Sequence, residues 1–260
     1  MSDALIFDTD ARGVATITFN RPRLHNAFDD KLIAELDQVL AGYGADPRVR
    51  VIVLRGAGKS FSAGADLDWM RRMADYSYEE NVRDAKVLAR LLSTLDRLPK
   101  PVIGLVQGAA YGGGVGLAAA CDIVIASEDA SFCLSEVKLG LIPSAISPYV
   151  VAAIGARQAR RWFVTAEVIG AERARDIGLV HELVPHDQLE TTLNGVLAAI
   201  FQGAPEAQAE AKDLVFLVAN RPVDEALLDE TGRRIAVRRA SAEGREGVQA
   251  FLAKRKPGWR

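Results

Sequence analysis

The chain has 260 residues, of which 49% are hydrophobic and 25% are charged, and its formal net charge at pH 7 is −2. A chain of this length and composition can bury one extensive hydrophobic core as a globular protein. A net charge so close to zero supplies no overall attraction to nucleic acid or to an acidic membrane, so neither is an expected partner.

The sequence shows no targeting or disulfide pattern. It starts with Met-Ser-Asp-Ala, without the basic segment and apolar run of a signal peptide, and no apolar stretch reaches the roughly 20 residues that span a bilayer. The two cysteines, Cys121 and Cys133, form no CxxC pair, and we expect both to be small buried residues. The default location for such a chain is the cytoplasm.

The first two thirds of the chain alternate between strand and helix patterns. Apolar runs and period-two alternation predict strands at residues 5–8, 14–20, 51–54, 102–106, 123–125 and 131–133. Helical spacing of apolar residues predicts helices at residues 29–43, 88–98 and 112–120. The first begins near Asp29 or Asp30, and Pro99 ends the second. Such alternation implies right-handed crossovers and therefore an α/β fold with a layered core.

The pattern becomes helical after Pro143. Helices are predicted at residues 158–163, 171–177, 188–201, 206–218, 225–239 and 243–254. Residues 178–184 form either a short strand or an extended linker. We therefore divide the chain into an α/β core over residues 1–200 and a C-terminal helical region over residues 201–260.

Several common site motifs are incomplete in this sequence. Leu117 breaks the spacing of a dinucleotide-binding GxGxxG motif, and no glycine-rich stretch leads into the Gly-Lys-Ser/Thr of a P-loop. His181-Glu182 begins like a zinc-binding helix, but Pro185 stands where the second histidine would be. Three histidines are present without metal-ligand spacing and are expected on the surface or in loops: His25, His181 and His186. The sequence thus predicts neither a metal site nor a redox cofactor.

Two glycine-containing segments stand out, at residues 60–67 and 107–117. Each follows a predicted buried strand, and each leads into a segment with helical character. Gly64 permits unusual backbone angles, and three consecutive glycines, 112–114, leave amide groups unshielded at a helix start. Two such turns after neighbouring strands could direct two N–H groups at one oxygen atom, as an oxyanion hole does. The alternative is that these glycines serve only tight turns and close helix packing.

The residues themselves resemble the crotonase family, the enoyl-CoA hydratase/isomerase superfamily. The resemblance covers essentially the whole chain in the order and spacing of that family, at residues 62–67, 111–117, 120–126, 132–143, 178–180 and 251–259. It implies a ββα spiral core carrying an acyl-CoA site, followed by a helical trimerisation region. It also implies a homotrimer or a dimer of trimers, and a CoA thioester as substrate.

The resemblance assigns roles to particular residues. The backbone amides of Ala65 and Gly113 would form the oxyanion hole. The remaining substrate contacts would come from Arg23, Leu24, Ala63, Gly64, Asp66, Leu67, Tyr111 and Gly112, with Phe251 and Lys254 reaching CoA from a neighbouring subunit. For Lys254 a solvated basic tail is an equally good interpretation.

The resemblance also identifies the catalytic acid. Relatives that hydrate enoyl-CoA usually carry two glutamates, and here Gly116 replaces the first while Glu136 keeps the second. Glu136 follows an apolar strand, so we expect burial to raise its pKa. The alternative for Glu136 is an exposed ion pair with Lys138.

Three functions remain open at this point. The first is an enoyl-CoA hydratase in which Glu136 both activates water and returns the proton. The second is a Δ3,Δ2-enoyl-CoA isomerase in which Glu136 alone carries the proton, and the third is a weakly active acyl-CoA-binding homologue.

Residues 112–117 and 136–150 favour the first, because they resemble bacterial methylglutaconyl-CoA and isohexenylglutaconyl-CoA hydratases of leucine and acyclic-terpene breakdown. Those substrates carry a second carboxylate, which Ser144, Ser147, Tyr111 or Lys138 could face. Three further residues are expected either to wall the acyl pocket or to pack in the core: Trp69, Met70 and Met73.

Overall fold

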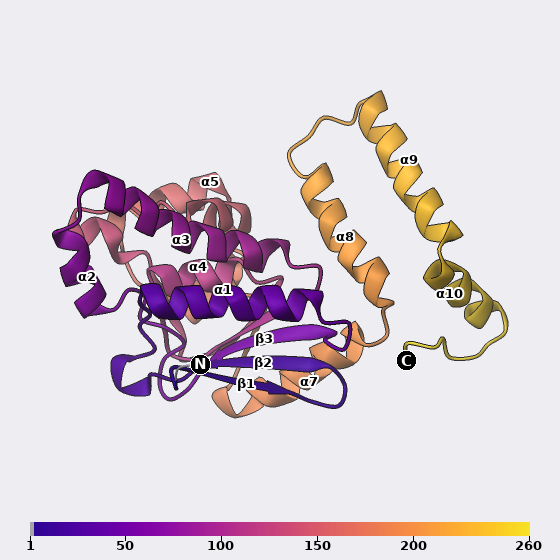
Figure 1. Cartoon of the computed structure of the whole chain (residues 1–260), viewed down its shortest axis with the longest axis horizontal. Coiled ribbons are helices and arrows are strands. Elements are labelled where there is room, and N and C mark those ends of the chain that lie inside the picture. The colour runs from indigo at the N-terminus through magenta and orange to yellow at the C-terminus, as the bar shows by residue number, and fades with distance from the viewer. Residues whose placement is uncertain (1–2) are drawn as a thin grey trace.

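The fold is built on a six-stranded sheet in a computed structural model that describes residues 3–260 (Figure 1). The strands lie in the order β1-β2-β3-β4-β6-β9. β1 is antiparallel to β2, and the other neighbouring pairs are parallel. Their bounds are Leu5–Thr9, Val14–Phe19, Val51–Gly56, Val102–Val106, Ile123–Ser127 and Glu182–Val184. Five of these six strands match predicted strands, and β9 shows that residues 178–184 end in a strand.

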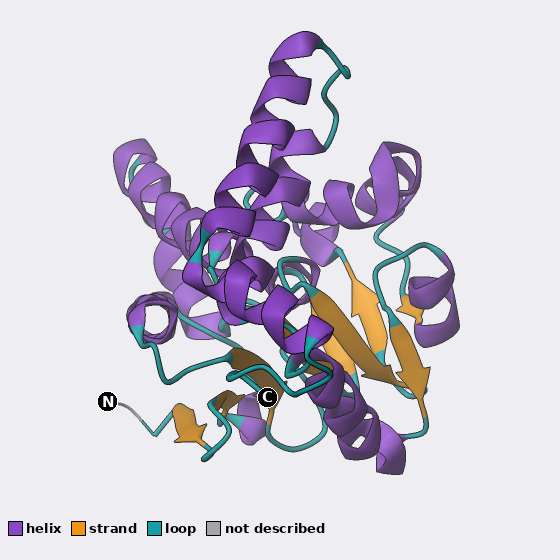
Figure 2. Cartoon of the chain, turned by 90° about the vertical axis from the view of Figure 1, so that its right-hand side faces the viewer, coloured by secondary structure: helices purple, strands orange, loops and turns teal. Residues whose placement is uncertain are grey.

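Helices cover both faces of this sheet, as its uninterrupted apolar strands require (Figures 1 and 2). On one face lie α1 (Asp30–Ala45) and α3 (Tyr78–Arg97), and on the other lies α7 (Leu189–Ile200). Within β3, Ile52 and Leu54 join the main core, while Val51 packs with α7. The strand is therefore buried from both sides.

The ends of the two long helices follow from local chemistry. Asp29 caps α1 by accepting a hydrogen bond from the Leu32 amide at 2.9 Å. Ser77 and Glu80 form a reciprocal capping box at the start of α3. α3 ends at Arg97, and the next residue, Leu98, is not helical because Pro99 disfavours the helical conformation in the residue before it.

A second, three-stranded sheet consists of β5 (Ala109–Tyr111), β7 (Ser131–Cys133) and β8 (Ile169–Gly170). β7 was predicted, but β5 and β8 were not. These strands have only three and two residues, so they carry no readable alternation of their own. Their pairing depends on contacts between distant parts of the chain.

Further helices and 3₁₀ turns connect these elements. They are α2 (Leu67–Ala74), α4 (Gly113–Ala119), α5 (Ser147–Thr165), α6 (Ala171–Asp176), and the 3₁₀ turns η1 (Pro22–Leu24), η2 (Ser135–Leu139) and η3 (His186–Gln188). The predicted helix at 158–163 is much too short, because α5 begins at Ser147. Gly155, with φ 74°, interrupts α5 and separates the half that the sequence pattern revealed from the half that it missed.

The three C-terminal helices project from the core: α8 (Pro205–Val218), α9 (Glu225–Ala240) and α10 (Ala242–Leu252) (Figure 1). All three were predicted to within two residues at each end. They bury very few side chains, none in α8, Leu227 in α9 and Ala250 in α10. The division of the chain at residue 200 stays a prediction. Between residues 3 and 260, no helix combines the length and the apolar character needed to cross a membrane.

Candidate active site

The small sheet brings three distant segments to one edge. β5 pairs in parallel with β7, with Tyr111 opposite Cys133, and Ser62 forms a parallel bridge with Ala110. Parallel strands end at the same edge, so the residues that follow each of them become neighbours. The Gly112 amide donates a hydrogen bond to the Cys133 carbonyl at 2.8 Å, which ties two of the segments together.

Gly64 allows the first segment to approach the second. Its φ is +86°, a conformation that other residues rarely adopt. A Cβ atom on Gly64 would lie 2.7 Å from the Tyr111 carbonyl oxygen and 3.4 Å from the Gly113 nitrogen. The close contact therefore places Ala65, the next residue, beside the start of α4.

Both predicted oxyanion amides keep a free N–H group. The Phe28 amide donates to the Gly64 carbonyl, and the Asp66 amide donates to the Phe28 carbonyl, each at 2.9 Å. These two hydrogen bonds form a parallel β-bridge between Phe28 and Ala65, in which the Ala65 N–H points away from Phe28. Gly113 is the first residue of α4, so its N–H has no acceptor within the helix. Neither amide donates a hydrogen bond to any of residues 3–260.

Phe28 fixes the position of the second amide. A Cβ atom on Gly113 would overlap Cζ of the Phe28 ring and lie 3.2 Å from its Cε2 atom. Phe28 is 2% exposed, so it has little room to move. No sequence motif pointed to Phe28, because its role arises from packing between segments 85 residues apart along the chain.

Glu136 lies at the same edge. It is part of η2, the turn that follows β7, and its Oε1 atom is 3.5 Å from the place that a Cβ atom on Gly112 would occupy. Its Oε2 atom is buried and has no hydrogen-bond partner in the described residues. Burial raises the pKa of the Glu136 carboxyl group, as predicted. Lys138 is exposed, and residues 3–260 contain no ion pair between it and Glu136.

Other predicted substrate residues surround this edge. Arg23 and Leu24 lie in the exposed turn η1, and Ala63 and Leu67 are also exposed. The Tyr111 hydroxyl lies 3.4 Å from Ser131 Oγ on the adjacent strand. Their contacts with CoA stay predictions, although their places beside Ala65 and Gly112 are compatible with that role.

The carboxylate of Asp66 is hydrogen-bonded to other groups of the protein. It accepts hydrogen bonds from the amides of Asp68 and Trp69 at the start of α2, and from Arg21 Nη2 at 2.8 Å. Burial by itself would raise the Asp66 pKa, but these backbone hydrogen bonds and the Arg21 charge lower it on balance. The carboxylate thus caps α2 directly after Ala65 and helps to hold that amide in place.

Phe251 and Lys254 lie far from this edge within one chain. Phe251 is in the last turn of α10 and Lys254 follows the helix, on the opposite side of the molecule from α2, and Phe251 is 81% exposed (Figure 1). For them to reach a site at Ala65 and Gly113, another copy of the chain would have to supply them. Their contact with CoA therefore stays a prediction that depends on oligomer formation.

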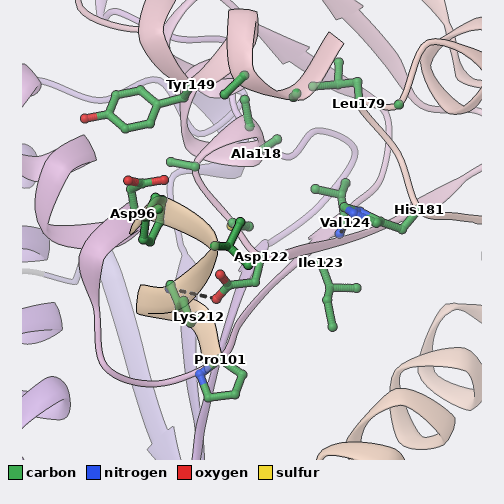
Figure 3. A pocket seen from close by; sticks show the side chains of 18 of the residues that line it. Asp96, Pro101, Ala118, Asp122, Ile123, Val124, Tyr149, Leu179, His181 and Lys212 are labelled. Carbon is green, nitrogen blue, oxygen red and sulfur yellow. Dashed lines mark hydrogen bonds and ion pairs between the residues drawn. The ribbon is translucent and has the colours of Figure 1, made fainter. Parts of the chain in front are cut away.

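A separate cavity of about 650 Å³ lies between the core and α8, and the sequence analysis did not anticipate it. Figure 3 shows Asp122 and Lys212 paired there at 2.8 Å, with Asp96, Tyr149 and His181 around them. Burial raises the pKa of Asp122 despite the Lys212 charge. None of the predicted site residues lines this cavity, so we place the candidate active site at the edge of the small sheet.

Comparison with known proteins identifies the family of the chain. The family profile described as Enoyl-CoA hydratase/isomerase matches residues 9–260. A solved structure from Legionella pneumophila, described as an enoyl CoA hydratase/isomerase (crotonase), is 49% identical with a TM-score of 0.94, and the match covers 100% of both chains. A Shewanella pealeana enoyl-CoA hydratase structure is 45% identical with a TM-score of 0.95, covering 98% of this chain and 96% of that one.

A curated relative, enoyl-CoA hydratase ACTT6 of Alternaria alternata, is 34% identical over 92% of this chain and 78% of its own length. The chain therefore belongs to the enoyl-CoA hydratase/isomerase (crotonase) family, and it is an enzyme of that family that acts on acyl-CoA. The predicted α/β fold of the crotonase type, with its helical C-terminal region, is confirmed.

Proposed function

We propose that the enzyme adds water to a 2-enoyl-CoA thioester, using the amides of Ala65 and Gly113 to bind the thioester oxygen and Glu136 to move the protons. The observation that carries this proposal is the meeting of two unpaired amides and one buried, unpartnered carboxylate at a single sheet edge. Such an arrangement matches the chemistry of an enolate that forms next to a proton carrier.

The reaction has two steps that balance in atoms and charge. Water attacks C3, Glu136 takes a proton from that water, and the C2–C3 π electrons move onto the thioester oxygen as an enolate. The enolate then collapses, C2 takes the proton back from Glu136, and the product is a 3-hydroxyacyl-CoA. Each preorganised amide in comparable sites stabilises the developing oxyanion by about 3 kcal/mol. This chemistry needs neither a metal nor a redox cofactor.

Glu136 is suited to both proton transfers. Burial raises the pKa of the Glu136 carboxyl group, which makes it a stronger base than an exposed carboxylate while it remains able to return its proton. Its free Oε2 atom also leaves one oxygen available for the attacking water. A single carboxylate can therefore perform the two roles that a pair of acids would otherwise share.

For the substrate we propose a thioester with a second carboxylate, of the 3-methylglutaconyl type found in leucine breakdown. The support is the resemblance at residues 112–117 and 136–150, together with Lys138. Lys138 is an exposed cation two residues after Glu136, and residues 3–260 provide it with no ion-pair partner. It can pair with a carboxylate at the far end of a short acyl chain.

A panel of acyl-CoA thioesters tests the reaction. We expect the absorbance of a conjugated enoyl-CoA to fall and mass spectrometry to show one added water. Glu136→Gln should lower kcat by about 100-fold or more while CoA affinity is retained, because proton transfer by a positioned side chain is worth that much. Glu128→Gln, in an exposed turn, is the matched control and should keep full activity.

Two results of the same panel would contradict the proposal. Growth of the conjugated absorbance from a 3-enoyl-CoA without hydration would identify an isomerase. Binding without turnover of any thioester, including 3-methylglutaconyl-CoA, would identify a binding protein.

Lys138→Gln tests the substrate class separately. We expect KM for 3-methylglutaconyl-CoA to rise about tenfold, since a charge-assisted contact is worth roughly 1.5–3 kcal/mol. KM for crotonyl-CoA, which has no second carboxylate, should stay unchanged. An equal change in KM for both substrates would show that Lys138 does not bind the second carboxylate.

A further inference from the structure

The position of the absent first acid lies at a tightly packed junction of three helices. Gly116 is buried within α4, and Leu92 of α3 and Ile146 at the start of α5 approach it. Leu92 is fully buried and Ile146 is 2% exposed. The backbone of Gly116 is not in the left-handed region, so space rather than conformation requires glycine here.

Ile146 occupies the space that a side chain at residue 116 would need. A Cβ atom on Gly116 would overlap Cγ2 of Ile146, and it would lie 2.8 Å from Cβ of Ile146 and 3.6 Å from Cδ1 of Leu92. Contacts under 3.0 Å to a Cβ atom cannot be relieved by turning a side chain, since Cβ is fixed to the backbone. Any residue larger than glycine therefore requires α4 and α5 to move apart.

The backbone of Ile146 is itself held in place. Ile146 is the residue before α5, and its carbonyl accepts a hydrogen bond from Val150, which is fully buried. Ile146 also lies within the turn into the helix, which Ser147 Oγ closes by donating a hydrogen bond to the Ser144 carbonyl at 2.8 Å. Moving Ile146 away from Gly116 would thus disturb both the turn and a core helix.

We infer that Ile146 is a specificity-determining residue, because its side chain fills the position from which a second carboxylate on α4 would enter the site. This inference rests on the proposed single-acid hydration. The absence of an acid at residue 116 is then a matter of packing as well as of sequence. The Gly116→Glu substitution alone therefore does not place a carboxylate in the site. At this point the site is lined by the hydrocarbon side chain of Ile146.

A double-mutant cycle in stability tests the packing without using turnover. Gly116→Ala should lower Tm by about 5 °C or more. An extra methyl group in a packed core lowers the free energy of unfolding, and Tm falls by a few degrees for each kcal/mol that is lost. In an Ile146→Gly background the same change should have little effect. Ile146→Ala removes the overlapping atom but keeps Cβ, so it should relieve the effect only in part.

Gly42→Ala is the control for the glycine change itself. Gly42 lies in α1 with no atom within 4 Å of the added Cβ, so the control should keep or raise Tm. Additive Tm shifts in the Gly116–Ile146 cycle would overturn the inference and leave the proposed hydration untouched.

Activity and its pH dependence test whether residue 116 faces the reacting atoms. Gly116→Glu alone should lose stability and gain no activity. Gly116→Glu with Ile146→Gly should hydrate crotonyl-CoA at least about tenfold faster than Ile146→Gly alone, and its pH profile should show a second ionisation. An unchanged rate with a single ionisation would show that residue 116 does not face the reacting atoms.

Failure of the proposed function is distinguishable from failure of this inference. A wild-type enzyme without hydratase activity would end the proposed function, while the Tm cycle would still report the packing of Gly116 against Ile146.

Discussion

At the scale of single residues, the site depends on a carboxyl group that the protein buries without giving it a partner. Glu136 Oε2 has no hydrogen bond in the described part of the chain, and burial raises the Glu136 pKa. A folded protein normally satisfies its buried polar atoms, and a catalytic role is one explanation for an exception. As a result, ionisation of Glu136 destabilises the folded state.

This cost has a defined pH dependence. The folded-state pKa of Glu136 is raised above the unfolded value, so between the two pKa values the folded state binds more protons and stability falls as pH rises. The Glu136→Gln variant has no ionisable group at this position, so it does not lose stability in this way as pH rises. We expect the Tm of the variant, relative to wild type, to increase as pH is raised from about 4 to 7.

Thermal unfolding of both proteins across that range measures the difference. A difference in Tm that is independent of pH would mean that Glu136 titrates as an ordinary exposed carboxyl group.

At the scale of elements, a helix cap holds the oxyanion segment. Asp66 caps α2 and pairs with Arg21, and it directly follows Ala65, whose amide is part of the proposed site. Arg21 also donates a hydrogen bond to the Ala27 carbonyl at 2.8 Å, so the same ion pair fastens the loop that carries the predicted CoA contacts. Stability and amide orientation are therefore linked through one carboxylate.

Asp66→Ala should lower both stability and catalytic efficiency. Loss of an N-cap costs about 1 kcal/mol, and the loosened Ala65 amide should reduce kcat/KM by about tenfold. Because the folded pKa of Asp66 is lowered, its contribution is present above the unfolded pKa of about 3.9 and is lost as pH falls through the folded value. The stability difference between wild type and variant should shrink accordingly at acidic pH.

Asp224→Ala provides a matched cap on another helix. Asp224 caps α9 by accepting from the Leu227 amide at 2.9 Å, and we expect a similar stability loss. Denaturant titration and steady-state kinetics on both variants separate the two effects. An equal loss of kcat/KM in the two variants would show that capping near Ala65 has no special influence on the site.

At the scale of the whole molecule, the C-terminal helices have little core of their own. Arg238 joins α8, α9 and α10 through ion pairs of 3.1 Å with Glu206, 2.9 Å with Glu210 and 3.0 Å with Glu243. Large apolar side chains remain exposed on these helices: Ile235, Val237, Val248, Phe251 and Leu252. An exposed apolar surface of this kind is typical of an interface, which is consistent with the proposed trimer or dimer of trimers.

Sedimentation velocity tests this proposal. Wild type should have a mass that is a multiple of three times 28.0 kDa, with the exposed Phe251 and Leu252 covered by a second copy. The double change Phe251→Glu and Leu252→Glu should shift the mass toward one chain and weaken CoA binding. Tyr78→Glu replaces an exposed aromatic residue at the start of α3, far from α10, and should change neither property (Figure 1).

Local sequence patterns predicted most of the elements because the patterns are properties of neighbouring residues. The strands of the large sheet and the helices α1, α3, α7, α8, α9 and α10 each contain enough residues to display a period. Residue spacing and resemblance also identify the glycines at 64 and 112–114 and the acid at 136. These features determine the family and the chemical groups at the candidate site.

Only the tertiary structure decided how those groups meet. β5 and β8 are too short to show a pattern, yet β5 aligns Ala65, Gly113 and Glu136 at one edge. Phe28 and Ile146 carried no motif, although one positions the Gly113 amide and the other closes the space beside Gly116. Contacts between residues far apart in the chain depend on which surfaces pack together, and a local pattern cannot contain that information.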